Sequence, residues 1–232
     1  MAARQNDAAM AEETVLGVDW HRRGWVAVVL GPAPPAVRVG DDLGALIAAE
    51  PGAACVAVDM PIGLAERRLR EADSAARAFV GPRRMSVFAT PPAKALEAAT
   101  YDAAKEVARA LTGKMISRQA WALGVNIKRV AEVAAGDARV IEVHPEVSFA
   151  ALAGTPLRFA KTTWNGQALR RRLLARAGIE LPEELEGDAG LVPVADVLDA
   201  AAAAWSARRY ARGEAKPLPE GAARGGRQVI WY

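Results

Sequence analysis

Apolar residues in the first sixty positions occur in short runs, and each run ends at a polar turn. Residues 15–29 hold two such runs around Arg22, Arg23 and Gly24, which is typical of two antiparallel strands joined by a tight turn. Ala36–Gly40 predicts a third strand. Residues 53–60 are apolar at nearly every position, as in a central, parallel strand buried on both faces. A helix ending near position 49, capped by Asp41 or Asp42, is expected before that run.

The pattern changes after position 63. Residues 64–92 hold six arginines against three acids and contain Pro82, Pro91 and Pro92, so we expect mostly loop there. Apolar spacing then predicts further elements in this order: helices at 101–111 and 117–133, a strand at 138–143, a basic helix at 166–177, a long helix at 194–209 and an edge strand at 228–232. Three successive strands followed by alternating helices and strands predict an α/β fold.

The bulk properties narrow the class of protein. We expect a flexible N-terminal tail at 1–13 and, because no clean linker divides the rest, a single domain at 14–232. No apolar run approaches the ~18 residues of a membrane span, and residues 1–13 do not resemble a signal peptide, so a cytoplasmic protein is expected. The single cysteine, Cys55, excludes an internal disulfide. A net charge of +3 permits nucleic-acid binding without indicating it.

Four aspartates stand where burial of a charge is expected. Asp19 ends the first apolar run and Asp59 ends the fourth, while Asp196 and Asp199 share one face of a helix that is apolar beyond them. An unpaired buried carboxylate is costly, so these side chains need either arginine partners or a metal ion. Oxygen ligands without nearby cysteine suit Mg²⁺ or Mn²⁺. Two such ions ~3.5–4 Å apart support in-line displacement at phosphate.

Several short motifs together resemble one known family. They are Gly17-Val18-Asp19, Arg23-Gly24-Trp25, Val58-Asp59-Met60-Pro61-Ile62-Gly63-Leu64, Arg84-Met85-Ser86-Val87-Phe88, Thr112-Gly113-Lys114, Glu142-Val143-His144-Pro145-Glu146 and Asp196-Val197-Leu198-Asp199-Ala200. The set resembles the bacterial domain-of-unknown-function family (DUF429 type) described as predicted RNase H-like nucleases, over nearly the whole chain. More distantly it resembles RuvC-type resolvases.

The resemblance implies an RNase H-like (ribonuclease H/actin-like) α/β fold. Its mixed sheet would have three antiparallel strands followed by parallel strands, with helices on both faces and a cap-like insertion at 64–135. Asp19 would be the central metal ligand, joined by Asp59, Asp199 and Asp196. Further residues that match the family's own motif, and that would line the same cleft as candidate catalytic groups, are Glu142, His144 and Glu146. For His144, a proton shuttle and a cap of the turn before Pro145 both stay open.

Basic and polar residues supply candidate substrate contacts. Four of them lie in the expected cap-like insertion at 64–135: Arg83, Arg84, Ser86 and Lys114. The other two, Arg23 and Lys161, lie outside it. All of these residues could grip phosphates, and the cluster from Arg170 to Arg172 could add to them. The alternative for the cluster is a solvated face. The alternative for Arg23 is an ion pair with Asp19.

Three functions follow. The first is a Mg²⁺- or Mn²⁺-dependent nuclease, a hydrolase of phosphodiesters in DNA or RNA. The second is an enzyme of the sugar-kinase and actin type that handles a small phosphorylated metabolite or nucleotide. The third is an inactive RNase H-like binding or scaffold protein whose acids pair with Arg23, Arg84 or Lys161. The oligomeric state stays open, with a homodimer among the alternatives.

Overall fold

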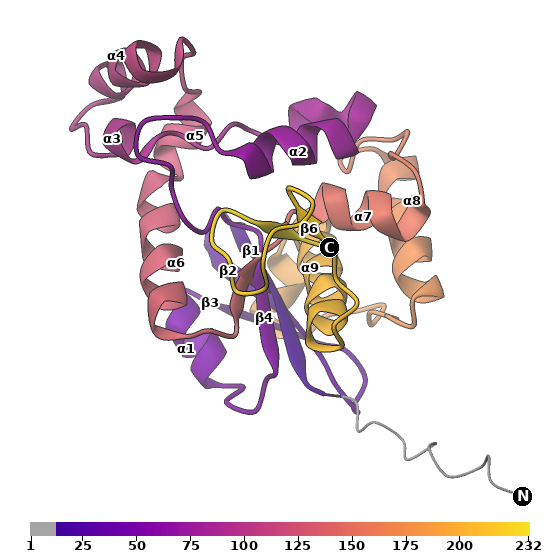
Figure 1. Cartoon of the computed structure of the whole chain (residues 1–232). Coiled ribbons are helices and arrows are strands. Elements are labelled where there is room, and N and C mark those ends of the chain that lie inside the picture. The colour runs from indigo at the N-terminus through magenta and orange to yellow at the C-terminus, as the bar shows by residue number, and fades with distance from the viewer. Residues whose placement is uncertain (1–12) are drawn as a thin grey trace, which may run out of the picture.

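A computed structural model describes residues 13–232, and its centre is a five-stranded mixed sheet of order β3-β2-β1-β4-β5. The first three strands pair antiparallel, and β4 and β5 continue the sheet parallel to β1. This α/β arrangement confirms the predicted fold class and is consistent with an RNase H-like fold (Figure 1). The strands are β1 (Val15–His21), β2 (Gly24–Leu30), β3 (Ala36–Gly40), β4 (Cys55–Val58) and β5 (Val140–Glu142).

Helices cover both faces of the sheet because alternate residues of each strand point to opposite sides. On β1, Val15 belongs to an apolar cluster with α9, whereas Leu16 and Val18 belong to a second cluster with α1 and α6. In Figure 1, α9, α7 and α8 lie on one side and α1 and α6 on the other. These helices are α1 (Leu43–Ala48), α6 (Gly124–Gly136), α7 (Pro145–Ala153), α8 (Trp164–Arg176) and α9 (Val194–Ala211).

The long helix α9 packs directly onto the backbone of β1 at Gly17. A Cβ atom built on Gly17 would lie 1.9 Å from the backbone nitrogen of Ala204 and 2.2 Å from the carbonyl oxygen of Ala200. Any larger residue at this position would therefore push the helix off the strand. The alanine-rich composition of α9 also favours this close contact, because small side chains let the helix approach the sheet.

The inserted region between β4 and α6 lies above one end of the sheet in Figure 1. The prediction of mostly loop at 64–92 is wrong for the helix at Glu71–Phe79, whose Ala72 and Ala76 are buried against Val147 and Leu218. The prolines lie beyond this helix and do not interrupt it. The elements of the region are α2 (Glu71–Phe79), the short 3-10 helix η1 (Gly81–Ser86), α3 (Ala93–Leu96), α4 (Tyr101–Thr112) and α5 (Arg118–Ala122).

Two other predicted elements differ from the structure in detail. The helix expected at 117–133 is divided at Leu123 into α5 and α6, where Gly124 packs against Leu96. The expected edge strand is β7 (Ile230–Trp231), which pairs with β6 (Pro217–Leu218) and joins the end of β5 by one bridge, from Trp231 to Val143. Helix α7 was not predicted.

The remaining expectations concern the N-terminus, the caps and the membrane. The tail predicted at 1–13 lies outside the described residues except for Glu13. Asp42, and not Asp41, caps α1, because its side chain accepts a hydrogen bond from the Ala45 amide. Within residues 13–232, no helix combines the length and the apolar character needed to cross a membrane.

Candidate metal centre

Asp19 and Asp59 lie side by side because their strands are parallel neighbours. Val18 is level with Val58 in the register of β1 and β4, and the Asp59 amide continues the ladder by donating to the Val18 carbonyl at 2.8 Å. Parallel strands bring their carboxyl ends to the same edge of a sheet. The two aspartates, 40 residues apart in sequence, therefore meet at this edge.

Asp199 joins them because α9 crosses β1 at Gly17. Gly17 and Asp19 are two residues apart on a strand and so share the face that α9 covers. Asp199 directly precedes Ala200, one of the α9 residues that contact Gly17. Asp19, Asp59 and Asp199 each offer a carboxylate oxygen, and these oxygens all lie within 4.8 Å of one another. Among residues 13–232, this trio is the one group of histidine, cysteine or acidic side chains close enough to hold a metal ion.

Asp196 lies one helical turn before Asp199 and lines the same cleft, but it stands outside the trio. It is half-buried, whereas Asp199 is buried. Burial and the charge of Asp59 raise the pKa of Asp196, and Lys161 and His21 oppose this rise. Asp196 therefore adds negative charge at the rim of the trio.

The trio resists full ionisation. Burial, together with repulsion from Asp59 and Asp199, raises the pKa of Asp19 well above its usual value. Burial also raises the pKa of Asp59, against the opposing charges of His144 and Lys161. For Asp199, burial raises the pKa to about 6. Three oxygen donors that repel one another form a donor set that a hard divalent cation would stabilise, so the residues present fit a metal ion.

Lys161 is the residue that forms an ion pair with the trio within residues 13–232, while His144 and Arg170 act electrostatically on Asp59 and Asp199. Its ammonium group donates a hydrogen bond to Oδ2 of Asp199 and also interacts electrostatically with Asp19 and Asp59. These carboxylates raise the pKa of Lys161 despite its partial burial. The side chain extends from the segment before α8 and stays 42% exposed. The third hypothesis, an inactive binding or scaffold protein, expects the acids to pair with Arg23, Arg84 or Lys161. The structure has such a pair between Lys161 and Asp199 and, within residues 13–232, none between these acids and Arg23 or Arg84.

Glu142 lines the cleft, but its carboxylate is held by fixed partners. Arg70 Nη2 donates to Oε1 at 2.5 Å, and the Ile62 amide donates to Oε2 at 2.6 Å. Arg70 is also 3.6 Å from Asp73, which accepts from the Thr90 amide at 2.7 Å. Burial raises the pKa of Glu142 to about 7, although Arg70 and the Ile62 amide favour its charged form. Glu142 thus ties β5 to the segment after β4.

Glu146 and His144 sit at the start of α7. Glu146 accepts from Arg83 at 3.2 Å and from Arg170 at 2.7 Å. Arg170 is fully buried, so a solvated face is the wrong interpretation for it, whereas Arg171 and Arg172 are exposed.

His144 caps α7, and its Nδ1 accepts from the Glu146 amide at 3.2 Å. The structure shows the cap, and the side chain also lines the cleft. A proton shuttle would require Nδ1 to take up a proton and leave the capping bond, because the neutral ring with an accepting Nδ1 already carries its proton on Nε2.

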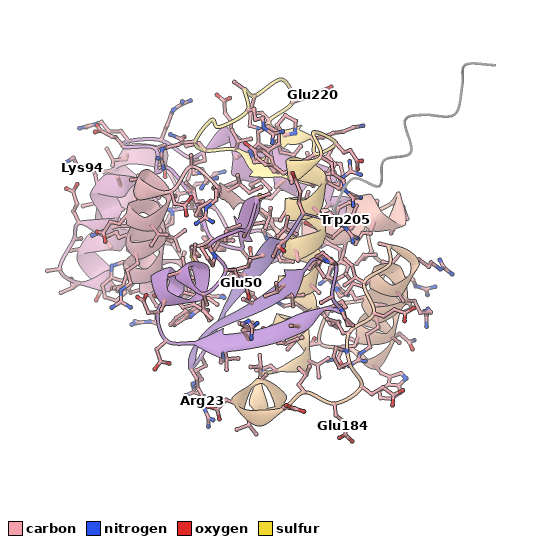
Figure 2. All side chains as sticks on the ribbon, turned by 90° about the horizontal axis from the view of Figure 1, so that it is seen from below. Arg23, Glu50, Lys94, Glu184, Trp205 and Glu220 are labelled. Atoms are coloured by element: carbon pink, nitrogen blue, oxygen red, sulfur yellow. The ribbon has the colours of Figure 1, made fainter. Side chains whose placement is uncertain are left out.

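One cleft of about 300 Å³ contains all of these acids. Its other walls come from the sheet edge and the inserted region, and include Trp20, Phe88, Gln119 and Leu123. Ser86 also lines it, with its hydroxyl donating to the Arg83 carbonyl. Arg23, Arg84 and Lys114 are exposed and do not line this cleft (Figure 2 shows Arg23 at the periphery).

Sequence reasoning missed Arg70, Asp73, Thr90 and the aromatic side of the cleft. Arg70 and Asp73 stand three apart at the start of α2, which is ion-pair spacing, and a buried helix start there would have been the signal. The partner of Arg70 across the fold, Glu142, lies 72 residues away and left no local signal.

The comparisons with known proteins give a family but no characterised relative. Neither the curated proteins nor the solved structures contain a match to this chain. The family model described as "Protein of unknown function (DUF429)" matches residues 17–224. This range contains the trio, the Arg70–Glu142 pair and Lys161. The chain therefore belongs to the DUF429 family of proteins of unknown function.

Proposed function

We propose that this protein is a divalent-metal-dependent phosphodiesterase that cleaves nucleic acid. The observation that carries the proposal is the trio of Asp19, Asp59 and Asp199, whose oxygens lie within 4.8 Å of one another at one edge of the sheet. A buried cluster of like charges is costly, and structural clusters normally resolve that cost with fixed counterions. Among the described residues, the cation that forms an ion pair with the trio is a half-exposed lysine, which favours a site built to receive a further cation.

Asp19, Asp59 and Asp199 would hold Mg²⁺ or Mn²⁺, with Asp196 alongside. Such an ion, when bound, supplies positive charge to the phosphate and activates water for attack. Oxygen-only donors favour these hard ions over zinc, which usually has nitrogen or sulfur ligands.

The chain's own residues supply proton transfer and substrate contacts. As a proton shuttle, His144 would first take a proton on Nδ1 and release the Glu146 amide; the resulting imidazolium can then protonate a leaving oxygen from Nε2 and return to the neutral ring. Ser86 and Lys161 line the cleft and can contact a phosphate. Glu142 and Glu146 hold the walls through arginines. Arg23, Arg84 and Lys114 would contact the substrate outside the cleft.

The decisive experiment compares Asp19→Asn with the parent and with Asp188→Asn, which alters an exposed aspartate outside the cleft. Single- and double-stranded DNA and RNA are incubated with each protein and Mn²⁺ or Mg²⁺. We expect cleavage by the parent and by Asp188→Asn, loss of cleavage in Asp19→Asn, and loss in all samples with EDTA. Equal cleavage by Asp19→Asn and the parent would exclude the proposal.

A small phosphorylated substrate is the second candidate. Two observations favour it: the cleft holds only about 300 Å³, and Lys161 is the one lysine or arginine among the described residues that line it. A polymer binder normally presents a track of basic groups, and its affinity falls steeply as salt rises. Binding measured between ~50 and ~200 mM salt separates the two, because a small substrate with one or two phosphates gives a shallow slope.

A further inference from the structure

Lys161 occupies the position of a counterion in the acidic end of the cleft. The cleft is lined by seven carboxylates from the described part of the chain and by a single lysine, Lys161, with no arginine. Two of those acids, Glu142 and Glu146, form ion pairs with arginines that do not line the cleft, and Asp73 lies beside Arg70. Lys161 therefore neutralises the part of the cleft that contains the trio.

The carboxylate that Lys161 binds is one that a metal would need. Its ammonium group donates to Oδ2 of Asp199, one of the three carboxylates of the trio. Asp19 and Asp59 also act electrostatically on Lys161. One carboxylate oxygen can accept from an ammonium group and bind a metal, but two positive charges held that close repel each other strongly in a buried site.

Lys161 can leave, unlike the arginines nearby. Arg70 and Arg170 are 1% and 0% exposed, and each is fixed between carboxylates or carbonyl groups. The Lys161 side chain is 42% exposed and has one hydrogen bond, to Asp199. Its flexible four-carbon stem can turn toward water without opening the core.

We propose that Lys161 is an internal counterion of the trio, and that a divalent cation takes its place at Asp199 and displaces its ammonium group toward the mouth of the cleft. The inference rests on the metal site of the proposed function, but it concerns binding and not the reaction. In the metal-free protein Lys161 reduces the repulsion among the acids. In the metal-bound protein its ammonium group is available to bind an anionic substrate at the mouth of the cleft.

Displacement predicts that removing Lys161 strengthens metal binding. If the pair with Asp199 is formed in about nine of ten metal-free molecules, the apparent affinity for metal is reduced by about tenfold. Isothermal titration with Mn²⁺ should therefore give a Kd at least about tenfold lower for Lys161→Met than for the parent. Lys161→Gln, which keeps a polar side chain at this half-exposed position, should show the same change.

Lys94→Met is the matched control. Lys94 also pairs with a carboxylate, Glu97 at 3.0 Å, but the pair is exposed, and neither residue lines the cleft (Lys94 is labelled in Figure 2). Its substitution removes the same charge and should leave the Kd for Mn²⁺ unchanged. A similar gain in both variants would attribute the effect to net charge and overturn the proposal.

A second readout follows the amine itself. Acetylation of each lysine by a limiting amount of acetic anhydride is measured by mass spectrometry with and without Mn²⁺. Displacement predicts that Mn²⁺ increases the labelling of Lys161 and leaves that of Lys94 unchanged. Labelling of Lys161 that stays constant or falls would overturn the proposal, as would weaker or equal Mn²⁺ binding by Lys161→Met.

These outcomes are distinct from a failure of the proposed function. A protein that cleaves no nucleic acid but shows both changes retains the displacement and loses the nuclease assignment. A protein that cleaves nucleic acid with an unchanged Kd in Lys161→Met retains the assignment and loses the displacement. If neither the parent nor the two Lys161 variants bind Mn²⁺, both the displacement and the proposed metal-dependent function are excluded.

Discussion

Two sets of buried carboxylates share the cleft, and they differ in how their charge is neutralised. Glu142 and Glu146 each accept from a buried arginine, and backbone amides or a second arginine complete the contacts. Within residues 13–232, Asp19 and Asp59 have no ion pair, and Asp199 has one, with the half-exposed Lys161. The first set is compensated by rigid groups that cannot leave. The second is compensated by a half-exposed side chain, which is why we propose a structural role for the first set and a metal site for the second.

The largest effect is expected when the rigid set loses an arginine. Arg70→Met leaves Glu142 and Asp73 buried without their counterion, which destabilises a folded protein by about 3–5 kcal/mol. Urea unfolding followed by circular dichroism measures the change. Arg68→Met is the control, because Arg68 pairs with Glu71 on the exposed side of the same helix start and should change stability little. Equal losses of stability in the two variants would mean that Arg70 is not a required counterion of Glu142 and Asp73.

A smaller stabilisation should follow addition of metal. A ligand that binds only the folded state stabilises it by about 2.7 kcal/mol when present at about 100 times its Kd. Mn²⁺ should therefore raise the melting temperature of the parent in differential scanning calorimetry, and should fail to do so in Asp19→Asn. A rise of equal size in both proteins would mean that the ion binds outside the trio.

The pH dependence of the free energy of unfolding should show how much the buried trio of aspartates destabilises the metal-free protein. Burial raises the pKa of Asp199 to about 6 and that of Asp19 well above its usual value. A carboxyl whose pKa is higher in the folded state binds more protons there, so its contribution to stability falls as pH rises from about 4 through that folded value.

Asp19→Asn removes one of these charges and keeps the oxygen that accepts from the Trp20 amide at 2.7 Å. With EDTA present, this variant should be more stable than the parent at pH 8, and the difference should shrink toward pH 5. Urea unfolding at several pH values measures both. A parent that is more stable than the variant at pH 8 would mean that Asp19 has a fixed counterion.

The smallest effect is expected at the outer edge of the rigid set. Arg83 is 26% exposed and shares Glu146 with the buried Arg170, so Arg83→Met should cost less than about 1 kcal/mol. The neighbouring Arg84, which is exposed, gives the control Arg84→Met with no expected change in thermal unfolding. A loss of several kcal/mol would place Arg83 with Arg70 among the rigid counterions.

The sequence alone located the strands and the acids at their ends. Apolar runs that stop at Asp19 and Asp59, and the pair Asp196 and Asp199 on one helix, identified the candidate acids, and the resemblance to the family implied that they share a site. The order of elements and the family motifs predicted the mixed sheet. These features are local, so they can be read from short stretches of chain.

Only the tertiary structure decided which acids are compensated and by which residues. Arg70 and Glu142 are 72 residues apart, Lys161 and Asp199 are 38 apart, and no local pattern specifies such pairs. Burial of Arg170 and the helix at Glu71–Phe79 depend equally on distant partners. The site's charge balance is a property of groups that meet only when the sheet, α9 and the inserted region are assembled, because electrostatic interactions depend on distance and burial and not on separation along the chain.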